Sequence, residues 1–274
     1  FGAAVTWTSR WFGSFYILLI TAALVFILGL AFSRFGRIRL GPDNSTPDFS
    51  TFAWTAMLFA AGIGTEILFF AVAEPVDQYV HPPTGDAQTI PPAARAREAI
   101  VLSLFHYGIS GWGLYALVGL AMAYFAYRRR DTLTLRSTLR PLLGRHTEGV
   151  IGDIVDAAAL VGGVFGIAAS LGVGVVQLNV ALNILFGLPQ GFPTQIGLTA
   201  LAVIMATVSA VSGVDRGVRV LSTINVLLAI GLALWVLVTG DAAFLIDALI
   251  GSIGDFFTRF PQLTLETYAH NRPD

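Results

Sequence analysis

Six long apolar runs constrain this chain more than any other feature. They cover residues 13–33, 52–80, 99–127, 153–186, 194–213 and 218–240. Each has at least the roughly 20 residues that a helix needs to cross about 30 Å of hydrocarbon. Only 12% of the 274 residues are charged, against roughly 25% in an ordinary soluble domain. Because backbone groups in lipid must be satisfied within their own segment, the runs predict six transmembrane helices in an all-α polytopic membrane protein.

The arginines give these helices an orientation. All 16 basic residues are arginine, and eleven lie on one side, in the connections 34–39, 128–145 and 216–219, against five on the other. By the positive-inside rule the side with eleven is cytoplasmic, so the run 218–240 leads outward. Arg136, Arg140 and Arg145 in the longest cytoplasmic connection are candidates for binding anionic lipid, with a solvated loop as the alternative.

Composition and motifs remove several classes of function. The net charge of -1 gives no basis for binding nucleic acid, and with no cysteine there is neither a disulfide frame nor a thiolate metal site. The sequence contains neither HExxH nor GxSxG, so we expect no enzyme and no metal or other cofactor. The chain starts on Phe1 without the features of a signal peptide, and we interpret it as an internal segment of a longer protein.

Glu66 stands in the middle of the second apolar run, in the stretch GIGTEILFF. A carboxylate at that depth costs roughly 3 kcal/mol, so it typically faces a polar cavity and serves a function. Gly62 and Gly64 each lower helix propensity by about 1 kcal/mol, which favours an open turn with a binding site near the membrane midplane. A hydrogen bond to a neighbouring helix is the alternative. Glu74, which precedes Pro75, is interpreted as a helix-end or interface residue.

Three aromatic residues of the third run define a candidate binding site. On a continuous helix Tyr107, Trp112 and Tyr115 would lie at about 0°, 140° and 80°, so they would share one broad face. Aromatic faces attract a quaternary ammonium group with about 2 kcal/mol when desolvated. A lipid-interface belt or plain packing is the alternative, and His106 is interpreted as a packed hydrogen-bonding residue. Three neighbouring glycines would leave space beside the rings: Gly108, Gly111 and Gly113.

The segment 241–261 alternates apolar and charged residues. Phenylalanine, leucine and isoleucine are interspersed with Asp241, Asp247, Asp255 and Arg259. This pattern predicts an amphipathic helix that lies along the outer interface, followed by a polar tail from Leu265.

Three stretches resemble the betaine/choline/carnitine transporter (BCCT) family: FAAGIGTEILFFAVAEP at 59–75, FHYGISGWGLYALVGLAMAYFAYR at 105–128 and VDAAALVGGVFGIAASLGVGVVQL at 155–178. The resemblance is collinear over nearly the whole chain. It implies twelve spanning helices on a LeuT-type 5+5 inverted repeat, of which this chain holds the first half and lacks both ends. The expected domains are a peripheral helix with a cytoplasmic loop (1–51), the first five-helix repeat (52–240) and an external interfacial helix with its tail (241–274).

The resemblance also implies roles for the second run. Gly62, Ile63 and Gly64 fall on the family's unwound glycine stretch, which contributes to substrate binding. Glu66 takes the place of a third glycine found in betaine carriers, where proton-coupled choline carriers commonly have Asp. Glu66 is therefore expected to bind substrate and to carry the coupling proton.

Other positions bear on substrate and ion. By resemblance Tyr107, Trp112 and Tyr115 belong to an aromatic box for the trimethylammonium group, whose remaining tryptophans come from the second repeat. Gly163 and Ile167 stand where sodium-coupled members have two threonines, and neither side chain can coordinate a cation. Sodium is therefore a less favoured coupling ion than the proton.

The sequence thus predicts a secondary active transporter that imports choline or a related quaternary ammonium compound for osmoprotection, with proton coupling. The alternative is a sodium-coupled or exchange transporter of glycine betaine, carnitine or another zwitterion. A channel-like or sensory membrane protein is the rival from another class. The resemblance further implies a bacterial inner-membrane location and a homotrimer.

Overall fold

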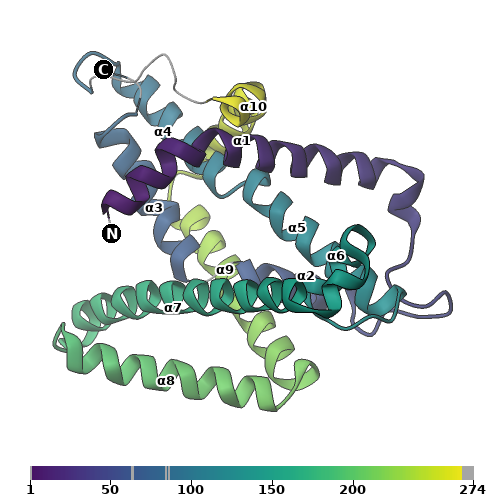
Figure 1. The fold of residues 1–274 in the computed structure, drawn as a ribbon. Coiled ribbons are helices and arrows are strands. Elements are labelled where there is room, and N and C mark those ends of the chain that lie inside the picture. Colours follow the sequence, from purple (N-terminus) through teal and green to yellow (C-terminus); the bar gives the residue numbers. More distant parts are fainter. Residues whose placement is uncertain (1, 63–64, 84, 86, 267–274) are drawn as a thin grey trace. The chain divides into compact units, whose positions relative to one another are not determined.

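The computed structural model describes residues 2–62, 65–83, 85 and 87–266, with the side chains of residues 4, 61–67, 215 and 216 outside that description. Within these residues the elements are helices joined by turns and loops, and no strand occurs among them (Figure 1). The predicted all-α class is therefore confirmed.

Five helical stretches among the described residues are long and apolar enough to cross a membrane: Val5–Phe32, Pro92–Arg128, Val150–Phe186, Phe192–Val211 and Arg219–Thr239. They correspond to the first and the third to sixth predicted runs. The second run is covered by α2 (Thr51–Gly62) and α3 (Thr65–Val80), and the two residues between them lie outside the description. Five of the six predicted spans are thus found, and the chain is part of a multi-pass membrane protein.

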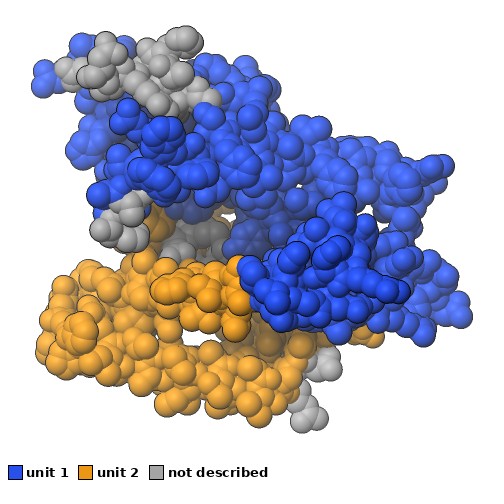
Figure 2. Space-filling model, in the orientation of Figure 1, with its two compact units in different colours: residues 1–45, 74–156, 248–274 blue, residues 46–73, 157–247 orange. Residues whose placement is uncertain are grey.

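Two compact units make up the chain, and Figure 2 colours them separately. Unit 1 consists of Phe1–Ser45, Glu74–Asp156 and Ala248–Asp274, and unit 2 of Thr46–Ala73 and Ala157–Asp247. The elements of unit 1 include α1 (Gly2–Phe32), η1 (Arg34–Arg37), α4 (Pro92–His106), α5 (Ile109–Ala123), η2 (Tyr124–Arg128), α6 (Leu135–Leu143) and η3 (Gly144–Glu148). The division into 1–51, 52–240 and 241–274 stays a prediction.

In unit 1, α1 packs against α5 through small residues. Ala23 and Leu24 of α1 are 5% and 4% exposed. A side-chain carbon added to Gly113 of α5 would lie 3.3 Å from Leu24 Cδ1, so this glycine permits the close approach of the two helices. Glycine and alanine are enriched at the contacts between membrane helices for this reason.

The predicted amphipathic helix is α10 (Ala242–Leu265), which extends past Pro261. Within unit 1 its aromatic residues pack on α4. Phe256 is 7% exposed and its ring centroid lies 5.3 Å from that of Phe260, which in turn lies 6.0 Å from Phe105. Arg97 of α4 makes two hydrogen bonds, of 2.6 and 2.8 Å, to the carboxylate of Asp255. This part of α10 is therefore docked on a neighbouring helix by apolar and ionic contacts together.

Replacing Phe256 with alanine is expected to destabilise unit 1 by about 3 kcal/mol, because the change leaves a cavity under α10. Phe257 provides the matched control, since it is the adjacent phenylalanine and is 60% exposed. Denaturant unfolding of the complete protein in detergent measures both variants. Equal losses for the two would show that α10 is not docked through Phe256.

The Arg97 contact makes the docking of α10 sensitive to acid. Hydrogen bonds from Arg97 hold the pKa of Asp255 below its ordinary value of 3.8. A carboxyl group whose pKa is lower in the folded than in the unfolded state stabilises the protein at pH values above its unfolded-state pKa. This contribution is lost as the pH falls through the folded-state pKa. On acidification below about pH 4, the melting temperature of the wild type should therefore fall by more than that of Asp255→Asn. Parallel curves for the two proteins would contradict this assignment.

Unit 2 is built on the packing of α2 against α9 (Arg219–Thr239), where Ala56 is 1% and Val226 8% exposed. It also contains most of α7 (Val150–Phe186), the whole of α8 (Phe192–Val211) and η4 (Val214–Val218). The 37 residues of α7 form one unbroken helix of about 55 Å, which is longer than about 30 Å of hydrocarbon and therefore fits a membrane only when it is tilted or extends past it.

A buried asparagine organises the turn between α7 and α8. Asn179 is 1% exposed, its amide nitrogen donates to the Pro189 carbonyl at 3.2 Å, and its side-chain oxygen accepts from the Gly191 N–H at 3.2 Å. These bonds pair the Gly191 N–H at the start of α8 and the Pro189 carbonyl in the turn, and so fix the connection between the two helices.

Candidate functional site

The third apolar run bends at Tyr107 and Gly108, in unit 1. Helix α4 ends at His106, the Tyr107 N–H donates to the Ser103 carbonyl at 3.1 Å, and Gly108 precedes α5 with φ -90° and ψ -147°. A side-chain carbon on Gly108 would lie 2.2 Å from the Leu104 carbonyl oxygen, which only glycine avoids. The expectation of one continuous helix through Tyr107, Trp112 and Tyr115 is therefore wrong.

Trp112 and Tyr115 meet within α5, and the bend adds a link from Trp112 to the main chain of Tyr107. The ring centroids of Trp112 and Tyr115 lie 5.6 Å apart at an interplanar angle of 40°. The indole N–H of Trp112 donates to the backbone carbonyl of Tyr107 at 3.0 Å. Trp112 is 38% and Tyr115 70% exposed, so both rings can be reached by a ligand. Tyr107 is thus tied to this pair by its main chain instead of by a shared helix face.

The glycines near the rings have other roles than the predicted one. Gly108 permits the bend, and Gly113 receives Leu24 of α1. A side-chain carbon on Gly111 would meet the His106 carbonyl at 3.8 Å, an ordinary contact. The idea that these glycines clear space beside the rings is therefore wrong for Gly108 and Gly113.

Two titratable residues that the sequence did not single out as a site meet beside this bend. His106 Nδ1 hydrogen-bonds to Oε1 of Glu74, whose side chain is 12% exposed against 52% for His106. Glu74 lies six residues before the end of α3, and Pro75 continues the same helix, so its assignment to a helix end is wrong. The prediction of a hydrogen-bonding role for His106 is confirmed. The 32 residues that separate the pair hide it from any local pattern.

The remaining predicted site residues belong to the second run. Gly62 is the last residue of α2, and the backbone of Glu66 lies in the first turn of α3. Ile63, Gly64 and the side chain of Glu66 lie outside the described residues. Their roles in substrate binding and proton coupling stay predictions.

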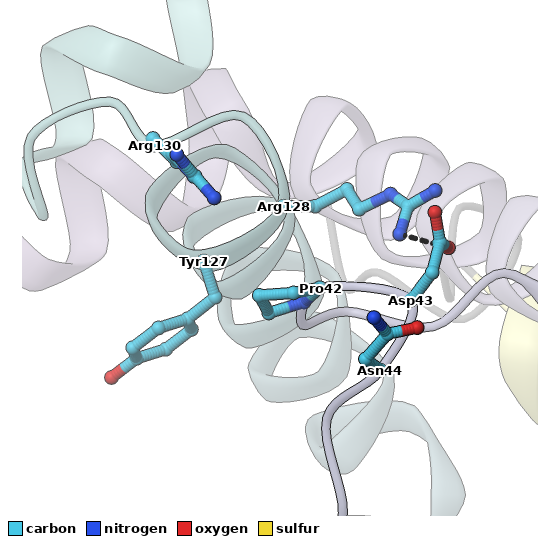
Figure 3. A pocket seen from close by; sticks show the side chains of 6 residues that line it. All are labelled: Pro42, Asp43, Asn44, Tyr127, Arg128 and Arg130. Atoms are coloured by element: carbon cyan, nitrogen blue, oxygen red, sulfur yellow. Dashed lines mark hydrogen bonds and ion pairs between the residues drawn. The ribbon is translucent and has the colours of Figure 1, made fainter.

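A cavity of about 530 Å³ lies away from the aromatic pair, in the part of unit 1 where η2 meets the loop after η1 (Figure 3). Arg128 faces Asp43 there, donating to its carboxylate at 2.6 Å and to the Gly41 carbonyl at 3.1 Å. Asn44, Tyr127 and Arg130 complete the lining together with Pro42. In the orientation predicted from the arginines, this cavity is expected on the cytoplasmic side.

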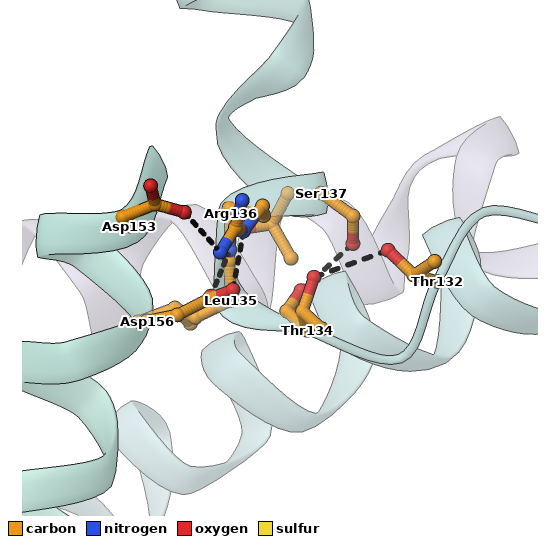
Figure 4. Close-up of polar contacts among 8 residues, drawn as sticks. Thr132, Thr134, Leu135, Arg136, Ser137, Asp153 and Asp156 are labelled. Atoms are coloured by element: carbon orange, nitrogen blue, oxygen red, sulfur yellow. Dashed lines mark hydrogen bonds and ion pairs between the residues drawn. The ribbon is translucent and has the colours of Figure 1, made fainter. Parts of the chain in front are cut away.

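Two arginines of the connection around α6, Arg136 and Arg140, are held by carboxylates. Arg136 bonds to Asp156 through Nε and through its backbone N–H, and its Nη2 lies 2.9 Å from Asp153 (Figure 4). These contacts, with Asp156 as the leading cause, raise the pKa of Arg136 further above its ordinary value. Arg140 pairs with Asp131 at 2.9 Å and with Glu148 at 2.8 Å. Arg136 and Arg140 thus brace this connection, which weakens the anionic-lipid interpretation.

Among the residues that the structure describes, no three acidic or histidine side chains come close enough to hold a metal ion. The helices and the aromatic pair thus define a multi-pass membrane protein with an accessible aromatic site. Comparison with known proteins then identifies its family.

The model of the betaine/carnitine/choline family transporters (BCCT) matches residues 1–274, so the chain belongs to that family. The high-affinity choline transport protein of Escherichia coli K12 is 51% identical over 272 residues, which are 99% of this chain and 40% of that protein. An osmo-dependent choline transporter of Acinetobacter baylyi is 47% identical over 97% of the chain and 38% of its own length. A glycine betaine transporter of the same species is 39% identical over 96% of the chain and 40% of its own length. The chain therefore spans about two fifths of these relatives.

Proposed function

We propose that the complete protein imports choline, or a close quaternary ammonium compound, in symport with protons, and that it supplies an osmoprotectant to a bacterial cell across the inner membrane. Two of the relatives above are named choline transporters, one of them osmo-dependent. The observation that carries the proposal is the pair of Trp112 and Tyr115, with rings 5.6 Å apart.

Such a pair suits a quaternary ammonium group for a physical reason. The cation has no N–H to donate, and its charge is spread over methyl groups, so an aromatic face attracts it where a hydrogen-bond acceptor does not. Each contact contributes about 2 kcal/mol when water is excluded. The hydrogen bond to Tyr107 holds the Trp112 ring in place before the ligand arrives, which lowers the entropy lost on binding.

Two features support the proposed proton coupling: the carboxylate of Glu66 and the side chains of two residues in α7. A carboxylate in an apolar run is costly when it is unpaired, so it favours either a proton or a cationic substrate as its partner. Exchange of one for the other at Glu66 couples their movements. In α7, Gly163 and Ile167 lie one turn apart and offer no hydroxyl group to a sodium ion.

Transport of a zwitterion such as glycine betaine is the second candidate, and the relative named a glycine betaine transporter supports it. The carboxylate of that substrate would approach a second carboxylate at Glu66, which costs free energy in a site with little water. A Glu66→Gly variant is expected to favour glycine betaine over choline for this reason.

The test is competition against labelled choline uptake by the complete protein in membrane vesicles. Choline should compete about 30-fold better than 3,3-dimethylbutanol, its uncharged isostere, because the isostere lacks the cation–π attraction. Glycine betaine and carnitine should compete less well than choline. Equal competition by the isostere would show that the aromatic site does not distinguish a charged ligand from an uncharged one. Stronger competition by glycine betaine than by choline would favour the second candidate.

A further inference from the structure

The contact between Glu74 and His106 joins a mostly buried carboxylate to the end of the helix that leads into the aromatic site. Glu74 lies in the interior of α3 and keeps 12% of its side-chain surface exposed. A carboxylate with so little water is costly unless it is paired. His106 is the last residue of α4, so the pair fixes the point where the chain begins to bend.

The bend transmits this restraint to Trp112. The residue after His106 is Tyr107, whose carbonyl accepts the indole N–H of Trp112 at 3.0 Å. The residue after that is Gly108, the pivot between α4 and α5. A shift of His106 therefore moves the carbonyl that sets the orientation of the Trp112 ring, and through it the pair with Tyr115.

We infer that Glu74 and His106 are positioning residues for the aromatic site: their contact holds the bend in the orientation that sets the Trp112 ring. The inference rests on the proposed function only for the identity of the ligand. A hydrogen bond to a carboxylate is roughly twice as strong as one between neutral groups, so loss of either partner loosens the bend.

The other charged groups on the neighbouring elements of unit 1 have partners of their own. On α3, Asp77 pairs with the exposed His81 at 3.0 Å. Between α4 and α10, Arg97 pairs with Asp255 and Glu98 with Arg259. On α4, Arg95 lies over the ring of Tyr79, with 4.4 Å between Cζ and the ring centroid. The described part of α5 contributes Tyr115 and no charged side chain.

The exposed pair of His81 and Asp77 offers a matched control, because it has the same chemistry at four residues' separation on one helix. Both side chains are more than 70% exposed, with 76% for His81 and 72% for Asp77. An effect that belongs to the contact between Glu74 and His106 is absent from His81→Gln. His106→Gln and Glu74→Gln each keep a hydrogen-bonding side chain while removing the charge of one partner.

The experiment uses the complete protein labelled with 5-fluorotryptophan, and fluorine NMR in the absence of substrate. The resonance of Trp112 is the one that disappears in Trp112→Phe. It should move or broaden in His106→Gln and in Glu74→Gln, and keep its wild-type position in His81→Gln. The same changes should appear in the Glu66→Gln background. An unchanged Trp112 resonance in both His106→Gln and Glu74→Gln would overturn the inference, and so would an equal change in His81→Gln.

Choline affinity separates this inference from the proposed function. His106→Gln should bind choline about fivefold more weakly than the wild type, and His81→Gln should bind it as the wild type does. If His106→Gln binds choline with wild-type affinity, the positioning role fails and the proposed function stands. If the wild type does not bind choline while the Trp112 resonance moves in His106→Gln, the proposed function fails and the positioning role stands.

Discussion

Replacing Trp112 with alanine should weaken choline binding by the complete protein about 30-fold. The variant loses the indole face beside Tyr115 and the hydrogen bond to the Tyr107 carbonyl. A desolvated cation–π contact contributes about 2 kcal/mol, and each 1.4 kcal/mol corresponds to about tenfold in affinity. Equilibrium binding of labelled choline to detergent-solubilised protein measures the loss directly, independent of any ion gradient.

Two further variants show which property of Trp112 matters. Trp112→Phe keeps an aromatic face and loses the N–H donor, so it should bind with an affinity between those of the wild type and the alanine variant. Trp235→Ala removes a 63% exposed tryptophan from α9 and should bind choline as the wild type does. Wild-type affinity in Trp112→Ala would contradict the aromatic site, and the interfacial-belt interpretation would then account for the ring.

Glu66→Gln should abolish accumulation of choline driven by an inward proton gradient. Glutamine cannot release a proton, so the exchange of a proton for the cation at this position is lost while the length of the side chain is kept. Exchange of labelled for unlabelled choline without a gradient does not need that proton and should continue in the variant. Accumulation and exchange in the same liposomes measure the two activities side by side.

The control for this change is Glu148→Gln, which alters a 65% exposed glutamate paired with Arg140 in the connection around α6. It should leave gradient-driven accumulation unchanged. Unchanged uptake with an unchanged pH profile in Glu66→Gln would refute the role of Glu66 and leave it with a structural hydrogen bond.

The helices could largely be predicted from hydropathy, because crossing lipid demands a long apolar run and a helical backbone. The predicted run 218–240 differs from α9 by one residue at each end, and 194–213 differs from α8 by two. The bend at Tyr107 could not be located this way. It depends on the contact between Gly108 and the Leu104 carbonyl, and glycine propensity alone does not distinguish a bend from a packing position such as Gly113.

Some contacts of the site could likewise be predicted from the sequence, and others could not. Trp112 and Tyr115 are three residues apart on one helix, so helical geometry predicts their contact. Glu74 and His106 are 32 residues apart, and their meeting depends on how α3 and α4 lie in unit 1. Arg97 and Asp255 are separated by 158 residues, and a count of charges per side of the membrane cannot pair them. Local periodicity therefore predicted the rings, while tertiary packing decides what positions them.

The most direct test of the account is uptake of labelled choline by the complete protein in sodium-free liposomes, with and without an inward proton gradient. The account predicts accumulation with the gradient and none without it. Accumulation that begins only when sodium is added would contradict it, because the coupling ion would then be one for which Gly163 and Ile167 provide no ligand.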